Sequence, residues 1–509
     1  MGSLRLRPPK PITEPMGKLQ VTRDTIKCPQ FEYDVARRNK EAIVGQQMNS
    51  LAYQRAQNES EDCLYLNIFR PKGTKLGDKL PILFWIFGGG FSSGDTPSYD
   101  SAGAQWVSAS VAQGQPIIFV TISYRLAGFG FLAGKEIKED GASNIGLLDQ
   151  RLGLEWISDN IESFGGDPEG VTIWGQSAGA ESVFDHTILY DGNITYNGKQ
   201  LFRGAIMNSG NIVPAHDVEH PKAQDIYNRV VDAGGCSEAS DTLECLRGLD
   251  YETFLNATTS VPDYNSYTSI ALSYLPRPDG NLLTASPEVL TRSKKYAQVP
   301  LIIGDQEDEG TTFSIYQSNI TTEQELADYL HKYYFPDLTP DLQQELISLY
   351  ADDRENGSPF RTGNANRWYP QFKRLAAILG DEVFTLARRI TLRTIEQLSP
   401  DLPTWSYLAS YNEGTPKLGT SHSSDIQQVV HGMKPNYAAE SFKQYYISFV
   451  NHLDPNKGVS KPSKFIYWPR YSQGHQLLQS FKGYSKLVVD DFRSKQYEFF
   501  NKTCAAFQI

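Results

Sequence analysis

The 509-residue sequence lacks the features that would tie it to nucleic acid or a membrane. Acidic side chains outnumber basic ones and the net charge is −11, which argues against binding to nucleic acid or to anionic membrane surfaces. No apolar run reaches the length of a transmembrane helix. The basic, proline-rich first ten residues have no apolar core, so no signal peptide is visible. In the absence of internal repeats or linkers, we predict one domain over residues 1–509.

Cysteine is scarce, and no C-x-x-C pair occurs, so the sequence offers little support for a zinc or redox site. The five cysteines are Cys28, Cys63, Cys236, Cys245 and Cys504. Cys236 and Cys245 bracket a short polar segment, as a small disulfide loop would. Glycosylation sequons begin at Asn58, Asn193, Asn256, Asn319, Asn356 and Asn501. The sequons and the cysteine spacing together favour a secreted protein. The lack of a visible signal peptide argues against it.

Buried strands and helical patterns alternate along the chain. We predict strands over residues 64–69, 80–87, 116–123, 171–174, 202–207, 299–304 and 405–410, several of them near-continuous apolar runs. We predict helices over residues 147–161, 322–353, 372–397, 441–453 and 490–500. Such strands are buried on both faces, so we expect an α/β fold with a mostly parallel sheet covered by helices on both sides. A further helix at Lys40–Tyr53 is either an ordinary surface helix or part of a movable lid.

The sequence Gly175-Gln176-Ser177-Ala178-Gly179 fits G-x-S-x-G and lies between a predicted strand and a predicted helix. This context is typical of a nucleophile elbow, in which the serine occupies a tight turn and presents its hydroxyl. A second match, Gly90–Gly94, runs into Asp95-Thr96-Pro97, where no helix is evident. Ser177 is therefore the candidate nucleophile, and a plain turn serine is the alternative.

In this kind of site the acid and the histidine follow the serine along the chain. The acidic loop after strand 299–304 contains Asp305, Glu307, Asp308 and Glu309, and the residues alone do not decide between them. A calcium loop is a poor alternative, because its twelfth position is Tyr316 instead of glutamate.

Five histidines follow the acidic loop: His331, His422, His431, His452 and His475. His331 and His452 lie in helical patterns. His422 lies in a loop that follows a predicted strand, where catalytic residues are often found. Spacing alone favours it about as strongly as His431 and His475 together. Gly88-Gly89-Gly90 directly follows strand 80–87 and is a candidate oxyanion hole, with a plain glycine-rich turn as the alternative.

These motifs resemble the type-B carboxylesterase and lipase family, which includes the cholinesterases, and within it most closely the fungal secreted lipases of the Candida and Geotrichum type. The family blocks are Phe164–Pro168 with Gly175–Gly179, Glu61–Asn67, Ser123–Leu126 and Gly146–Gln150. The blocks typical of the fungal lipases are Trp85–Phe91, Ser273–Gly280, Ile303–Gln306 and Phe384–Arg389. The resemblance covers nearly the whole chain and implies an α/β-hydrolase fold.

The resemblance also implies a role for each matching residue. Ser177 would be the nucleophile, Glu309 the acid and His422 the base. The N–H groups of Gly89, Gly90 and Ala178 would form the oxyanion hole, and Ser209 would support the acid. The disulfides would be Cys28–Cys63, which closes a candidate lid loop at residues 28–63, and Cys236–Cys245. No cofactor or metal is implied.

The resemblance has departures. Phe87 stands where many members have histidine, and Gln176 replaces a commoner glutamate. The block beginning at Leu4 is usually preceded by a few tens of residues, so we expect that an N-terminal segment is missing.

The expected activity is hydrolysis of small-molecule or lipid esters, in which the lid could contact a lipid–water interface. We expect no nucleic acid and no stable protein partner. The alternatives are an esterase for short soluble esters with a vestigial lid, and a non-catalytic binding domain on the same fold.

Overall fold

The computed structural model describes residues 4–18, 20–22, 26–31, 59–351, 356–432, 435–459 and 463–509. The helix expected at Lys40–Tyr53 and most of the candidate lid loop lie outside the described residues. Both expected disulfides, Cys28–Cys63 and Cys236–Cys245, are present.

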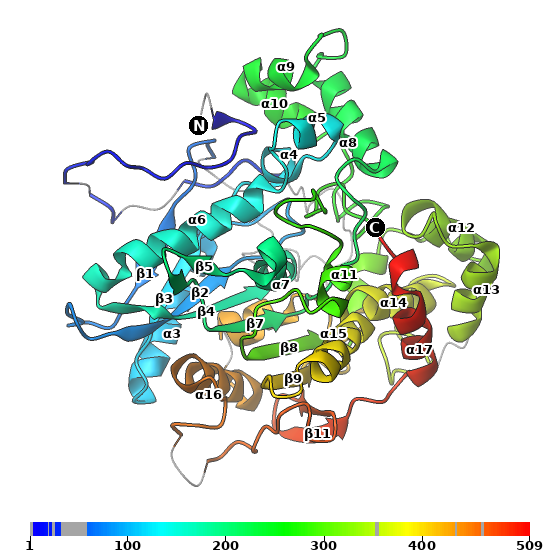
Figure 1. Ribbon diagram of the computed structural model, residues 1–509. Helices are drawn as coiled ribbons and strands as arrows, with labels where there is room; N and C mark the ends of the chain where they lie inside the picture. The colour runs from blue at the N-terminus through cyan, green and yellow to red at the C-terminus, as the bar shows by residue number, and fades with distance from the viewer. Residues whose placement is uncertain are drawn as a thin grey trace.

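One nine-stranded sheet runs through the molecule (Figure 1). In sheet order its strands are β1 (Leu66–Phe69), β3 (Ile118–Ile122), β2 (Leu80–Ile86), β4 (Gly166–Gln176), β7 (Gly204–Asn208), β8 (Leu301–Gln306), β9 (Thr404–Ala409), β10 (Gln476–Ser480) and β11 (Ser485–Val489). The outermost pairs, β1–β3 and β10–β11, are antiparallel, and every other pair is parallel. The α/β prediction with a mostly parallel sheet is confirmed, and we propose that the chain forms a single domain around this sheet.

Helices cover both faces of the sheet, which explains why its central strands are near-continuous apolar runs. On one side lie α6 (Ile145–Asn160), α7 (Ala178–Gly192), α11 (Pro287–Arg292) and α15 (Leu386–Leu398); on the other lie α3 (Asp100–Ala112) and α16 (Tyr437–His452). The elbow strand is anchored here by aromatic packing, since the Trp174 ring lies 4.5 Å from that of Trp85 and 4.9 Å from that of Trp106.

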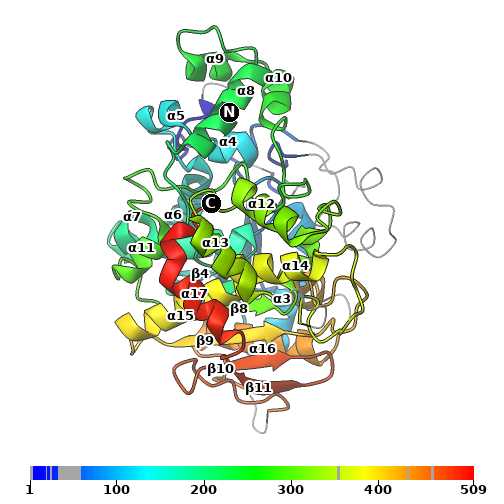
Figure 2. The same ribbon diagram turned by 90° about the vertical axis from the view of Figure 1, so that its right-hand side faces the viewer.

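The remaining helices flank this core (Figure 2). They are α4 (Ala127–Phe131), α5 (Lys135–Glu139), α8 (Pro221–Ala233), α9 (Thr242–Gly248), α10 (Tyr251–Thr258), α12 (Glu323–Tyr333), α13 (Pro340–Leu349), α14 (Phe372–Gly380) and α17 (Ser494–Thr503); β5 (Thr195–Tyr196) and β6 (Lys199–Gln200) form a separate small hairpin. None of the described helices combines the length and apolar character needed to cross a bilayer.

Three predictions about elements are wrong in detail. The segment 322–353 is two helices, because Pro336 lies in the break and a Thr339 cap starts α13 at Pro340. The segment 372–397 contains a π-helical turn, Asp381–Thr385, between α14 and α15. A helix does follow the second G-x-S-x-G match, since α3 begins at Asp100; its buried face is built largely from small residues, which hides the apolar pattern.

A buried charge cluster joins β8, α15 and the segment after β11. The Arg388 guanidinium donates to Asp305 at 2.8 Å and to both oxygens of Asp490 at 2.9 and 3.0 Å. Arg389 also donates to Asp490, and all four side chains are buried. Burial by itself would raise the pKa of Asp490, but the two guanidinium groups outweigh it and hold that pKa well below its usual value. The cluster therefore ties the end of the sheet to the strand that leads into the acidic loop.

We predict that Asp490→Asn lowers the free energy of unfolding at pH 7 by about 3–5 kcal/mol, because it leaves buried guanidinium groups without their anion. Asp225→Asn is the control, since it breaks an exposed pair with Arg229 that is worth about 0.3–0.5 kcal/mol. Denaturant titration of both variants measures the difference, and equal losses would contradict a structural role for the cluster.

Candidate active site

Ser177 occupies a strained turn between β4 and α7. Its backbone has φ 57° and ψ −131°, a combination that non-glycine residues seldom adopt. The turn is fixed from both sides, because the Ser177 N–H donates to the Asn208 carbonyl of β7 and the Ser177 carbonyl accepts from Ala180 and Glu181. The serine hydroxyl is thereby presented at the carboxyl end of the parallel strands.

The glycines of the motif are required by close packing. A Cβ on Gly175 would lie 2.2 Å from the Gly179 carbonyl oxygen, and a Cβ on Gly179 would lie 2.1 Å from the carbonyl oxygen of Ile86. Strand and helix can therefore approach this closely only with glycine at both positions.

A continuous hydrogen-bonded relay leads away from the serine hydroxyl. The Ser177 Oγ lies 2.8 Å from His422 Nε2, and His422 Nδ1 lies 2.5 Å from Glu309 Oε2. The second carboxylate oxygen of Glu309 accepts from the Gln306 N–H at 2.7 Å. The rings of Phe313 and Phe384 each lie 4.9 Å from the imidazole, and Glu309 is buried. This arrangement can move a proton from the hydroxyl to the imidazole while the carboxylate holds the ring.

The four carboxylates of the acidic loop, which the sequence alone did not distinguish, have different partners. Asp305 pairs with Arg388, and Glu307 pairs with Arg361 at 2.5 Å. Only Glu309 among them reaches the histidine.

Asp308 connects the acidic loop to the loop that contains His422, called the histidine loop below. Its carboxylate accepts from the backbone N–H groups of Thr420 and Phe360 at 2.9 and 2.8 Å. Its own N–H donates to the Thr420 carbonyl, two residues before His422. Burial, with the nearby Glu307 carboxylate, raises the pKa of Asp308 to about 7. Sequence reasoning missed this role, because the signal is a set of backbone contacts between segments 112 residues apart.

The other histidines that follow the acidic loop have separate surroundings. His331 and His452 lie on helices, as their patterns indicated, and both are exposed. His431 is buried and stacks on Tyr99 at 5.6 Å. His475 lies 2.8 Å from Glu396. None of these four rings hydrogen-bonds Ser177 within the described residues.

The glycine turn after β2 lies beside the serine. Gly89 and Gly90 have φ 110° and 59°, which favour glycine, and both line the same pocket as Ser177. Neither N–H donates a hydrogen bond to another described residue. Ala178 is the first residue of α7, where helix N–H groups lack internal partners. Ser92, in the second motif match, instead donates its hydroxyl to the Gly90 carbonyl and behaves as a turn serine.

Two buried polar residues, Ser209 and Gln176, contact residues next to the relay. The Ser209 hydroxyl accepts from Gln306 Nε2 at 3.3 Å, and the Gln306 backbone N–H in turn donates to Glu309. Gln176 donates to Ser423 at 3.2 Å and its amide nitrogen lies 3.4 Å from His422 Nε2. The glutamine that replaces the commoner glutamate therefore places an uncharged amide against the histidine.

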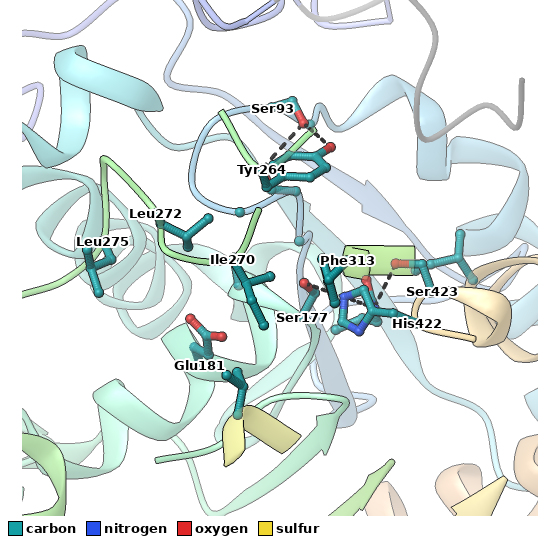
Figure 3. A pocket seen from close by; sticks show the side chains of 18 of the residues that line it. Ser93, Ser177, Glu181, Tyr264, Ile270, Leu272, Leu275, Phe313, His422 and Ser423 are labelled. Carbon is teal, nitrogen blue, oxygen red and sulfur yellow. Dashed lines mark hydrogen bonds between the residues drawn. The ribbon is translucent and has the colours of Figure 1, made fainter. Parts of the chain in front are cut away.

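A pocket opens over Ser177 and His422 (Figure 3). Its apolar lining consists of Val213, Ile270, Leu272, Leu275, Phe313, Val383, Phe384, Ile426 and Ile509. Tyr264 and Ser93 hydrogen-bond each other at 3.2 Å on another part of the wall. An apolar pocket over a serine–histidine pair suits an uncharged, hydrophobic substrate.

Outside this pocket, one group of described residues has the composition of a metal site: His216, His220 and Asp337. Its surroundings are poorly suited to a cation. The His220 Nδ1 accepts a hydrogen bond from the Lys222 N–H at 3.3 Å, which leaves the ring proton on Nε2. The positive charges of Arg277 and Lys222 also act on both rings.

Comparison with known proteins decides the family. The model of the carboxylesterase family matches residues 1–500. The chain belongs to the carboxylesterase family. The family and its relatives make it a carboxylic ester hydrolase of the carboxylesterase and lipase type.

Several fungal proteins are similar to this chain in sequence or in fold. A secreted lipase of Botryotinia fuckeliana is 55% identical, covering all of this chain and 88% of that protein. A secreted triacylglycerol lipase of Gibberella zeae is 51% identical, covering all of this chain and 86% of the relative, and a Diutina rugosa lipase is 40% identical, covering 98% and 89%. The crystal structure of EstA from Aspergillus niger superimposes with a TM-score of 0.82 at 27% identity, covering all of this chain and 93% of that chain. The predicted resemblance and the α/β-hydrolase fold are confirmed.

We predict that Asp308→Asn lowers kcat about 100-fold with a smaller change in KM, because an amide cannot accept from Thr420 and Phe360 as both carboxylate oxygens do, and the histidine loop shifts. Glu307→Gln in the same loop is the control and should stay near the wild-type rate. Steady-state hydrolysis of a soluble ester measures both. A wild-type kcat in folded Asp308→Asn would contradict the positioning role.

Proposed function

We propose that the protein hydrolyses carboxylic esters through an acyl-enzyme formed on Ser177. The observation that carries the proposal is the relay of 2.8 Å from Ser177 Oγ to His422 Nε2 and 2.5 Å from His422 Nδ1 to Glu309. In the first step His422 takes the hydroxyl proton while Oγ attacks the ester carbonyl carbon. Glu309 holds the imidazole in the required tautomer and stabilises the imidazolium.

The oxyanion of the tetrahedral intermediate would be held by the N–H groups of Gly89, Gly90 and Ala178. Each such donor is worth on the order of 3 kcal/mol of transition-state stabilisation. The C–O bond then breaks, and His422 gives its proton to the leaving alcohol. A water activated by the same histidine attacks the acyl-enzyme, releases the acid and restores the Ser177 hydroxyl. Every step uses side chains and backbone groups of this chain.

We further propose that the substrate is a lipid ester and that the protein is secreted. The apolar lining of the pocket favours hydrophobic acyl chains, and relatives 55% and 51% identical carry the names of secreted lipases. Two disulfides support an oxidising compartment. An esterase for short soluble esters is the second candidate. A non-catalytic binding domain is disfavoured, because the complete relay is present.

We predict that Ser177→Ala lowers the hydrolysis of p-nitrophenyl esters at least about 10⁴-fold, because the nucleophile is lost. A series from acetate to palmitate tests the substrate class at the same time. Activity that rises with chain length and persists above the solubility limit supports a lipase, whereas activity confined to short soluble esters supports the second candidate. Full activity in Ser177→Ala would overturn the mechanism.

We also predict that Glu309→Gln lowers kcat about 10³- to 10⁴-fold with little change in KM, because an amide no longer holds the imidazolium. Glu413→Gln is a matched control, since Glu413 is an exposed partner of Arg361. Equal rates for Glu309→Gln and the wild type would remove Glu309 from the mechanism.

A further inference from the structure

Glu181 is an acidic side chain that the proposed mechanism does not use. It lies in α7, one helical turn after Ser177, and it lines the same pocket. Within the described part of the chain its carboxyl group makes no hydrogen bond and no ion pair. The side chain is half-buried and places an unpaired carboxyl group on the wall of the pocket, where a few polar groups set which substrates fit.

The surroundings of Glu181 favour its neutral form. The neighbouring pocket wall is apolar, with Ile270, Leu272 and Leu275 nearby in Figure 3. Burial raises the pKa of Glu181 to about 8. The ionisable groups coupled to it are Asp185 on the same helix, Glu382 on the π-helical turn and Tyr124. All three are acids, so none of them supplies a positive charge. At neutral pH the group is therefore a carboxylic acid with one donor and one acceptor facing the pocket.

The direction of the proposed reaction places the acyl chain on this side. His422 gives its proton to the leaving alcohol, so the alcohol leaves on the side of Ser177 where the imidazole lies. In Figure 3 the carboxyl group of Glu181 lies on the opposite side of Ser177 from His422. The acyl part of the substrate therefore extends past Glu181. Four residues of helix rise about 6 Å, which places the carboxyl group several bonds along the chain from the reacting carbonyl.

We propose that Glu181 makes the pocket selective for esters whose acyl chain carries a hydroxyl or oxo oxygen, which hydrogen-bonds its carboxyl group. The proposal rests on the function proposed above and specifies its substrate class. An unsubstituted chain covers the carboxyl group and leaves it unpaired, whereas an oxygenated chain satisfies it. The selectivity therefore depends on where the oxygen stands along the chain.

Competition between two substrates in one reaction tests the proposal. Ethyl octanoate competes in turn with its 3-, 6- and 8-hydroxy derivatives, and chromatography of the released acids gives the ratio of kcat/KM values directly. We expect the wild type to prefer at least one hydroxy ester, and Glu181→Leu to lower that ratio about tenfold. Glu181→Gln should keep most of the preference, because an amide also donates and accepts. Leu272→Ala is the control, since it changes the same wall without removing a polar group.

The ratio also has a predicted pH dependence. Burying an apolar chain against an ionised carboxylate costs more than burying it against a neutral acid. The wild-type preference for the hydroxy ester should therefore grow as the pH rises through about 8, whereas the ratio for Glu181→Leu should stay flat. If Asp185, Glu382 or Tyr124 caused the pH dependence instead, the ratio for Glu181→Leu would still change with pH.

The failure of this proposal is distinguishable from failure of the proposed function. Equal ratios in the wild type and Glu181→Leu for all three hydroxy esters would overturn the role of Glu181, even with ethyl octanoate hydrolysed normally. Hydrolysis that persists undiminished in Ser177→Ala, or no hydrolysis of any ester by folded wild type, would instead overturn the function, and the selectivity with it.

Discussion

The strained backbone at Ser177 is the constraint on which the active site depends. Its φ of 57° and ψ of −131° are held by β4 and β7 on one side and by the first turn of α7 on the other. Glycine at 175 and 179 lets these segments touch, and the packed Trp174 keeps β4 in place. The strain is maintained by the sheet, so the hydroxyl is positioned before any substrate arrives.

His422 and Glu309 are held near Ser177 by hydrogen bonds between two loops that are far apart in the sequence. Asp308 fastens the end of β8 to the loop that carries His422, and Gln306 holds Glu309 through its backbone N–H. Behind them, Arg388 ties β8 to Asp490 near the end of the chain. The acidic side chains of this short loop therefore have different partners, and among them only Glu309 hydrogen-bonds His422. At Asp490 the two guanidinium groups outweigh burial and lower the pKa, whereas at Asp308 burial prevails and raises the pKa.

The sequence predicts the parts of the structure whose signals are local. Continuous apolar runs indicated the central strands, and the strand–serine–helix context indicated the elbow. The β10–β11 hairpin was missed, because QLLQS and SKLVV mix polar and apolar residues at the sheet edge. The choice of Glu309 and His422 came from the family resemblance, since spacing alone left other acids and histidines open. The role of Asp308 depends on tertiary contacts that no local pattern reveals, and Glu181 became notable only once its pocket was known.

We propose that Ser177, activated by His422, is the nucleophile of the reaction. Treatment with diethyl p-nitrophenyl phosphate, followed by intact mass measurement and peptide mapping, tests this directly, because attack by Oγ on phosphorus expels p-nitrophenolate and leaves a stable diethylphosphoryl group. We expect one label per chain, on Ser177, with complete loss of esterase activity and no label on Ser92. A label on another residue that abolishes activity, or full activity after stoichiometric labelling of Ser177, would contradict it.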